Sequence, residues 1–168
     1  MPMNATRRAT RSEPAPPRLA LSVQHEPGAG ECPADRPQLR RWALAALERD
    51  AELTLRFVGA REGRALNAQF RGRDYATNVL TFAYDAQGET PGRSDDGPVQ
   101  ADIVICLPVL VREARAQKKP LREHLAHLVI HGVLHAQGMD HEDEDEAREM
   151  EARETALLRR FRIADPYR

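Results

Sequence analysis

The chain has 168 residues, of which 41% are hydrophobic and 30% are charged, and its formal net charge is −1. This length favours one domain that closes its core without disulfide bonds, and the composition is that of a globular protein rather than a disordered one. Because no apolar run reaches the roughly 18 residues of a membrane-spanning helix, and the N-terminus lacks a signal-like apolar stretch, we expect a cytoplasmic protein without a membrane partner.

The first 17 residues contain arginine, threonine and proline without an amphipathic pattern, which predicts a disordered N-terminal extension, with an arginine-rich transit peptide as the alternative. We expect residues 18–168 to form a single domain. Apolar residues that alternate or recur at helical spacing predict two strands and two helices in its first half, with the strands at 19–23 and 52–58 and the helices at 37–50 and 61–70.

The second half begins with two segments rich in β-forming residues, at 78–84 and 99–107, which are separated by a glycine- and proline-containing loop. Helices follow, the first of them beginning near Pro108 and the others covering about 121–137 and 142–161. Strands therefore dominate the first two-thirds of the chain and helices its end. This order predicts an α+β domain in which a small mixed β-sheet of about four strands is covered by helices.

Three histidines, His131, His135 and His141, stand at the spacing H-x3-H-x5-H within this helical region. Residues four apart lie on one face of a helix, so the first two imidazoles can point at the same ion. On a continuing helix the third would point about 240° away from the second. Gly138 resolves the problem, because glycine tolerates a positive φ and can end the helix so that the chain turns back.

This arrangement predicts one Zn²⁺ ion on a helix of the C-terminal half and on the turn after it, with a fourth coordination position left for water. The spacing also matches zinc proteases of the metzincin type, in which a glutamate after the first histidine is the general base. Gly132 occupies that position here, so the protease base is missing. Three imidazoles also suit nickel, cobalt or copper, and the sequence leaves the native metal open.

Two further histidines, His124 and His127, precede this group on the same predicted helix. Ligands on three successive turns would spread over about 12 Å of helix axis, which is too far to share one ion. We therefore place His127 outside the ligand set, beside the ligands, facing the substrate or as an ordinary helix residue. Asp140 either orients His141 or caps the acidic helix that follows.

The segment H-G-x-L-H-x-x-G-x-D-H, an acidic helix after it and a final D-P-Y resemble the YbeY family of bacterial endoribonucleases and rRNA maturation factors. The resemblance extends to the block 70–74 (F-R-G-R-D), to T-N-V-L-T-F from Thr77 and to D-I-V-I from Asp102. The chain departs from the family pattern without losing a candidate ligand or a charge, at Phe70, Ala76, Thr81 and Ala101.

The resemblance implies a zinc-dependent, single-strand-specific endoribonuclease that acts in 16S rRNA 3′-end maturation and in ribosome quality control. It implies His131, His135 and His141 as metal ligands and Arg71 as a functional arginine. The implied partners are single-stranded rRNA, the small ribosomal subunit with one of its platform proteins, and an Era-type GTPase. Arginine presents a planar cationic fork that suits phosphoryl oxygens, although an ordinary surface arginine is the alternative for Arg71.

Two other functions stay open from the sequence. Another zinc hydrolase, such as a peptidase, is supported by the histidine spacing alone and is opposed by the glycine at position 132. A non-catalytic ribosome-assembly factor could use the zinc ion as a structural clip. The sequence identifies no general acid or base.

Overall fold

The computed structural model describes residues 13–84 and 97–168. Within these residues the elements are β1 (Leu19–His25), the short 3-10 helix η1 (Pro27–Ala29), α1 (Arg36–Ala46), β2 (Ala51–Val58), α2 (Ala60–Arg71), β3 (Val79–Tyr84), β4 (Val99–Cys106), α3 (Leu107–Gln117), α4 (Leu121–Ala136) and α5 (Glu144–Arg160). The expected N-terminal extension lies largely outside the described residues, and so does most of the expected loop before β4.

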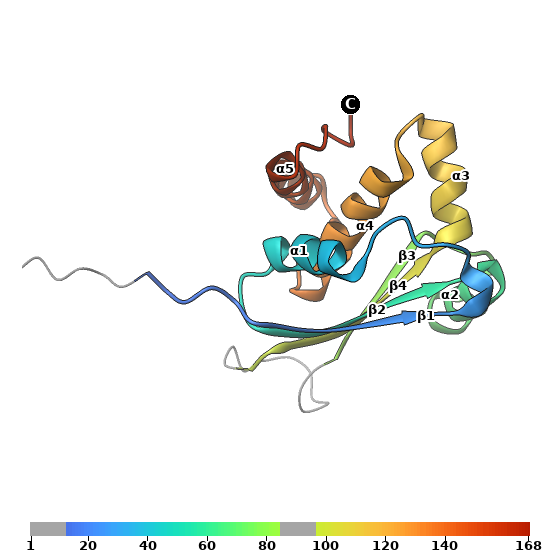
Figure 1. Cartoon of the computed structure of the whole chain (residues 1–168), viewed down its shortest axis with the longest axis horizontal. Helices are drawn as coiled ribbons and strands as arrows, with labels where there is room; N and C mark the ends of the chain where they lie inside the picture. Colours follow the sequence, from blue (N-terminus) through green and yellow to red (C-terminus); the bar gives the residue numbers. More distant parts are fainter. Residues whose placement is uncertain (1–12, 85–96) are drawn as a thin grey trace, which may run out of the picture.

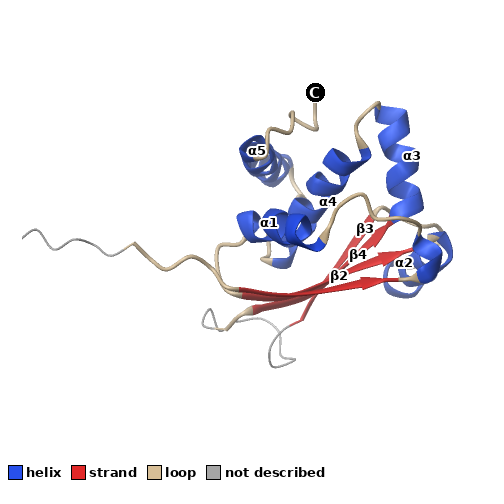
Figure 2. Ribbon diagram, viewed as in Figure 1, coloured by secondary structure: helices blue, strands red, loops and turns tan. Residues whose placement is uncertain are grey.

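The strands form one mixed sheet in the order β1-β2-β4-β3, in which β3 is antiparallel to β4 and the other neighbours are parallel. One face of this sheet is covered by α1 and α4, and α5 lies on the far side of α4 from the strands (Figure 1). Figure 2 shows α2 at the opposite end of the sheet from the N-terminal segment. The predicted α+β domain with a small mixed sheet covered by helices is therefore confirmed.

Side chains of β4 alternate between two apolar clusters, because successive residues of a strand point to opposite faces. Ile103 and Ile105 face the main core, together with buried residues of α1, α4 and α5. Val104 and Cys106 face a smaller cluster, against which Leu66 of α2 packs. Each fully buried side chain of this size contributes about 1.5–3 kcal/mol, so the main core dominates the stability of the fold and fixes α4 on the sheet.

The close approach of α4 to the sheet depends on Gly132. A Cβ atom at this position would lie 2.8 Å from Cγ2 of Ile103 and 3.5 Å from Oγ1 of Thr81. Glycine is therefore required where the helix crosses β4 and β3. Because this side of α4 faces the sheet, the histidines beside Gly132 project from other sides of the helix.

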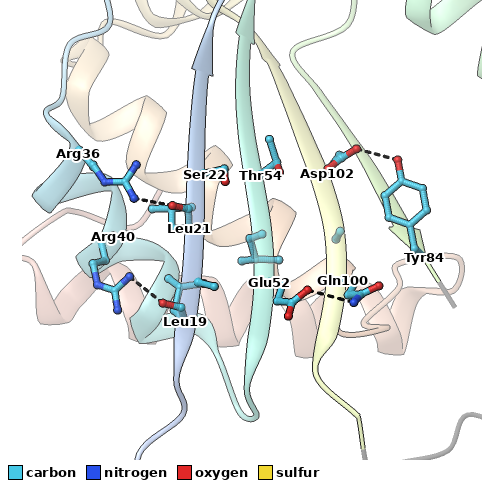
Figure 3. Close-up of a pocket in the computed structure, with 13 residues that line it drawn as sticks. Leu19, Leu21, Ser22, Arg36, Arg40, Glu52, Thr54, Tyr84, Gln100 and Asp102 are labelled. Atoms are coloured by element: carbon cyan, nitrogen blue, oxygen red, sulfur yellow. Dashed lines mark hydrogen bonds between the residues drawn. The ribbon is translucent and has the colours of Figure 1, made fainter. Parts of the chain in front are cut away.

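The second face of the sheet is covered by α2 only in part. Polar side chains line its open half, including Glu52, Gln100 and Asp102, and Tyr84 donates a hydrogen bond to Asp102 (Figure 3). At the outer edge of β1, the guanidinium groups of Arg36 and Arg40 donate to the carbonyl oxygens of Leu21 and Leu19, at 2.5 and 2.8 Å. These contacts occupy backbone acceptors that an edge strand otherwise leaves free.

No helix in the described part of the chain combines the length and the apolar character that a membrane crossing requires.

Candidate metal centre

The helix that carries the histidine motif ends where the sequence predicts. The last residue of α4 is Ala136, and Gly138 has a φ of 96°. The backbone N–H of Gly138 donates to the carbonyl of His135 at 2.9 Å, and that of Met139 donates to Leu134 at 3.2 Å. This left-handed glycine reverses the chain direction, so the segment after it returns alongside the end of the helix.

The reversal brings three imidazole rings together. The centroid of the His131 ring lies 4.5 Å from that of His135 and 5.9 Å from that of His141, and the last two centroids are 4.9 Å apart. Nitrogen atoms about 2.1 Å from a shared tetrahedral ion would place the ring centroids roughly 5.3 Å from one another. The donor set and its spacing therefore fit a single zinc ion.

The protonation of His135 suits metal binding. Burial first, and then the neighbouring rings of His131 and His141, together lower the pKa of this imidazole to about 4. A neutral imidazole is the form that offers a lone pair to a metal, whereas the protonated ring offers none. Near neutral pH the His135 ring is thus neutral, in the form that can bind a metal.

The buried carboxylate of Glu154 accepts a hydrogen bond from His131, the first of the three histidines. Glu154 of α5 is 0% exposed, and its two oxygens accept hydrogen bonds from Nδ1 of His131, from Nε2 of His127 at 3.0 Å and from the hydroxyl of Tyr167. Burial alone would raise the pKa of Glu154, but the hydrogen bonds from the two histidines and Tyr167 lower it to about 2. The carboxylate is therefore charged, and it leaves Nε2 of His131 as the ring atom available to an ion.

His127 lies outside the three-ring group, as its place on the helix predicts. Its ring centroid is 6.1 Å from that of His131, and it contacts Glu154 and Tyr167 rather than the other ligand candidates. Ligand atoms of His127, His131 and Glu154 lie within 4.8 Å of one another and form a second possible metal-binding group. In that second grouping the atoms already satisfy each other by hydrogen bonds, so we favour the three-imidazole group as the metal centre.

His124 extends the histidine series away from the centre. Its Nε2 lies 2.8 Å from the carboxylate of Glu113, which also accepts hydrogen bonds from the amide of Asn78 at 3.2 Å. The two remaining histidines of α4 are thus each bonded to a glutamate, and neither belongs to the three-ring group.

Of the two roles predicted for Asp140, the structure excludes the helix cap and places the residue beside His141. The residue that caps α5 is Asp143, whose side chain accepts from the backbone N–H of Glu146 at 2.8 Å, so Asp140 is not the cap. Its carboxylate accepts from the backbone N–H of His141 at 2.8 Å. Ligand atoms of His135, Asp140 and His141 lie within 4.8 Å of one another, which places this carboxylate beside the three-ring group.

Arg71 is exposed in the last turn of α2, apart from the histidines. The preceding Phe70 packs edge-on against Phe82 of β3, with ring centroids 4.9 Å apart, on the sheet face opposite Thr81 and α4. No hydrogen bond, ion pair or ring contact joins Arg71 to the three histidines within residues 13–84 and 97–168. The structure therefore brings the three predicted ligands together but leaves Arg71 across the edge strand from them.

The contacts of Glu154 and Tyr167 with the histidines were not predicted from the sequence. The signal for Glu154 is its place on the apolar stripe of α5, between Met150 and the pair Leu157 and Leu158, where a charged residue requires a partner. Tyr167 belongs to the final D-P-Y of the family resemblance, but nothing in that motif indicates a contact with Glu154, because the tyrosine reaches this residue only through the course of the C-terminal segment.

Together these features define a class of small α+β domains that gather three histidines at the end of a buried helix. The family profile described as Endoribonuclease YbeY matches residues 36–162. The chain belongs to the YbeY family.

Curated relatives named Endoribonuclease YbeY resemble almost the whole chain. The protein of Cupriavidus pinatubonensis is 54% identical over 91% of this chain and 74% of its own length. The protein of Bordetella pertussis is 54% identical over 89% of this chain and 96% of its own length. The solution structure of a Thermotoga maritima protein, 23% identical, matches the fold with a TM-score of 0.50 over 84% of this chain and 91% of that one.

Proposed function

We propose that the protein is a zinc-dependent, single-strand-specific endoribonuclease that acts in 16S rRNA 3′-end maturation and in ribosome quality control. Its membership of a family whose curated relatives are named endoribonuclease supports cleavage of RNA. The observation that carries the metal dependence is the convergence of His131, His135 and His141, whose ring centroids lie 4.5–5.9 Å apart. Zinc fits these donors, and it stays one choice among metals that bind imidazole.

The three imidazoles would hold the ion and leave part of its coordination sphere to solvent or substrate. When bound, the ion would supply Lewis acidity toward a phosphoryl oxygen or a water molecule. Glu154 keeps His131 in one orientation through the bond to Nδ1, and the enclosure of His135 keeps its ring neutral. These contributions prepare the ligands before RNA arrives.

Arg71 would bind the anionic backbone of the RNA and act as the catalytic arginine. Within the described residues its guanidinium group has no protein partner, whereas Arg64 pairs with Asp74 at 2.7 Å and Arg73 bonds to Tyr75. The end of α2 and the histidine centre flank the edge strand β3 from opposite faces. A single strand of RNA that crosses this edge can contact both, and a flexible single strand makes such a turn more easily than a duplex.

The partners that we propose follow from the same family resemblance. They are the small ribosomal subunit with one of its platform proteins, and an Era-type GTPase, all met in the cytoplasm. A peptidase is less well supported, because position 132, where zinc proteases carry the general base, faces the sheet here. A side chain at Gly132 would collide with Ile103 and could not reach the metal centre.

Metal analysis and RNA cleavage by the same purified protein test this proposal. We expect one zinc ion per chain, cleavage of single-stranded RNA that stops on chelation, and neither property in the variant His131→Ala/His135→Ala. The matched control is His25→Ala, since this exposed histidine lies on β1 outside the centre. Full cleavage by the double variant would exclude metal-dependent catalysis. Zinc binding by the wild type without RNA cleavage would favour the assembly factor with structural zinc.

The role of Arg71 has its own test. We expect Arg71→Ala to cleave RNA at least 10-fold more slowly with zinc content unchanged, because loss of a group that stabilises transition-state charge costs about 10²–10³-fold. Arg61→Ala is the matched control, an exposed arginine of the same helix. Equal rates for the two variants would remove Arg71 from the mechanism and leave the metal centre untouched.

A further inference from the structure

The C-terminal segment after α5 is fixed against the body of the domain. The carboxylate of Asp165 accepts from the backbone N–H of Tyr167 at 2.8 Å, and Lys119, between α3 and α4, donates to the carbonyl of Pro166 at 2.5 Å. The Tyr167 ring packs edge-on against the ring of His127, with centroids 5.4 Å apart. These contacts direct the hydroxyl of Tyr167 inward, to the carboxylate of Glu154.

Glu154 has three donors for its two oxygens. Oε1 accepts from Nδ1 of His131, and Oε2 accepts from Nε2 of His127 and from the hydroxyl of Tyr167. A carboxylate that accepts from a neutral imidazole fixes the proton on the bonded nitrogen. His131 thus carries its proton on Nδ1 and presents the lone pair of Nε2, on the side where His135 and His141 lie.

The hydroxyl of Tyr167 also restricts the position of the Glu154 carboxylate. Without this hydroxyl, Oε2 of Glu154 would keep only the hydrogen bond from His127. Burial and the hydrogen bond to the Glu154 carboxylate both raise the pKa of Tyr167, so its hydroxyl stays a donor. The tyrosine therefore determines how rigidly Glu154 can hold the metal-side ring.

We propose that Glu154 and Tyr167 are a positioning pair for the metal centre: the C-terminal tyrosine fixes the buried glutamate, which fixes the tautomer and orientation of His131. This inference rests on the proposed function only in that His131 is a metal ligand. Neither residue touches the ion or the RNA. The last residues of the chain are thereby part of the construction of a site centred on α4.

The first test uses metal-free protein and does not depend on catalysis. NMR of the imidazole nitrogens reports the tautomer of each histidine. We expect His131 to be the Nδ1–H tautomer in the wild type and to become a mixture of tautomers in Glu154→Gln and, to a smaller extent, in Tyr167→Phe. Tyr84→Phe is the matched control, because Tyr84 also donates to a carboxylate but lies on the open half of the sheet, away from α4.

The second test measures Zn²⁺ affinity by competition with a chromophoric chelator. Loss of a partner that orients a metal-binding histidine weakens metal affinity about 10–100-fold, so we expect a loss in that range for Glu154→Gln. For Tyr167→Phe, which removes one of three donors, we expect a loss near the lower end, about 10-fold. Tyr84→Phe should bind zinc as tightly as the wild type.

The outcomes separate this inference from the proposed function. Wild-type tautomer and wild-type zinc affinity in Tyr167→Phe would overturn the positioning role of the tyrosine, and the same results in Glu154→Gln would overturn the pair. Zinc binding by wild-type protein that cleaves no RNA would refute the proposed function while the positioning pair stands. Because Tyr167 is partly exposed, its phenylalanine variant keeps the test valid even if Glu154→Gln fails to fold.

Discussion

Two tyrosine–carboxylate pairs in this protein have the same chemistry and different surroundings. Tyr84 donates to Asp102 at 2.7 Å on the open half of the sheet (Figure 3), and Tyr167 donates to Glu154 behind α4. The two tyrosines are similarly exposed, at 55% and 45%, but Asp102 is only half-buried whereas Glu154 is 0% exposed. The two pairs therefore differ in the burial of the carboxylate and not in that of the tyrosine.

The pKa values of the two tyrosines are raised for different reasons. For Tyr84 the main cause is the hydrogen bond to Asp102, whereas for Tyr167 burial comes first and the bond to Glu154 second. Water can replace a lost partner at Asp102. At Glu154 it cannot, and the histidines bonded to the same carboxylate would change with it. Burial of the carboxylate therefore couples the Tyr167 hydrogen bond to the histidines, whereas within the described residues the Tyr84 bond stands alone on the surface.

Removal of each carboxylate is the strongest test of this comparison. In metal-free protein we expect Glu154→Ala to lower the free energy of unfolding by about 3–5 kcal/mol, because breaking a buried charge network leaves its donors without partners. We expect Asp102→Ala to stay within about 0.5 kcal/mol of the wild type, as surface substitutions do. Urea unfolding measures both values. Similar losses for the two variants would contradict the difference between the sites.

Zinc binding should stabilise the protein and change local dynamics around the histidines but not around Tyr84. At a free Zn²⁺ concentration of 100 times the dissociation constant, we expect about 2.7 kcal/mol of added stability, because the ion binds only the folded state. Hydrogen exchange should slow at the end of α4, in the turn after it and in α5. The strands around Tyr84 should exchange unchanged, and the variant His131→Ala/His135→Ala should show no zinc effect. Slowed exchange around Tyr84 instead would place the ion elsewhere.

The two helices that flank the sheet can be compared through their buried glycines. We expect Gly132→Ala in α4 to cost about 1–3 kcal/mol, since its Cβ would lie 2.8 Å from the buried Ile103 and overpack the core. In α2, Gly63→Ala meets Cys106 at the milder distance of 3.1 Å, and helix propensity returns up to about 1 kcal/mol. Thermal unfolding should show Gly63→Ala close to the wild type. A reversed order would mean that α4 is free to move away from the sheet.

The smallest expected effect is at the outer edge of β1. Arg40→Ala removes the hydrogen bond to the carbonyl of Leu19, and we expect a loss of about 0.5–1.5 kcal/mol. The adjacent exposed Arg41 is the control, and its alanine variant should change the free energy of unfolding by less than about 0.5 kcal/mol. Equal values would show that water satisfies this edge as well as the guanidinium group does.

Local sequence signals predicted most of the secondary structure. Alternating apolar residues located β2 to within one residue, and Pro108 marked the first turn of α3. The expected helix over 37–50 was too long, because α1 ends at Ala46 and β2 begins at Ala51. The apolar residues near this boundary serve the core in either conformation, so periodicity alone did not separate the helix from the turn after it.

In the candidate site, too, local features were predicted and contacts between distant residues were not. The spacing of His131 and His135 and the glycine after them are local features, and they predicted that three rings meet at the end of one helix. Glu154 is 23 residues from His131 along the chain, and no pattern linked them before the packing of α5 on α4 was known. The position of Arg71 across the edge strand from the histidines was equally beyond the reach of the motif.

The sequence by itself determined the strands, the helices, the mixed α+β class and the histidine turn, because these depend on the period of apolar residues and on the φ that glycine permits. Only the tertiary structure decided which carboxylate holds His131 and which tyrosine holds that carboxylate. The reason is that a buried charge finds its partners through packing between elements distant in the sequence, and no local spacing encodes that contact.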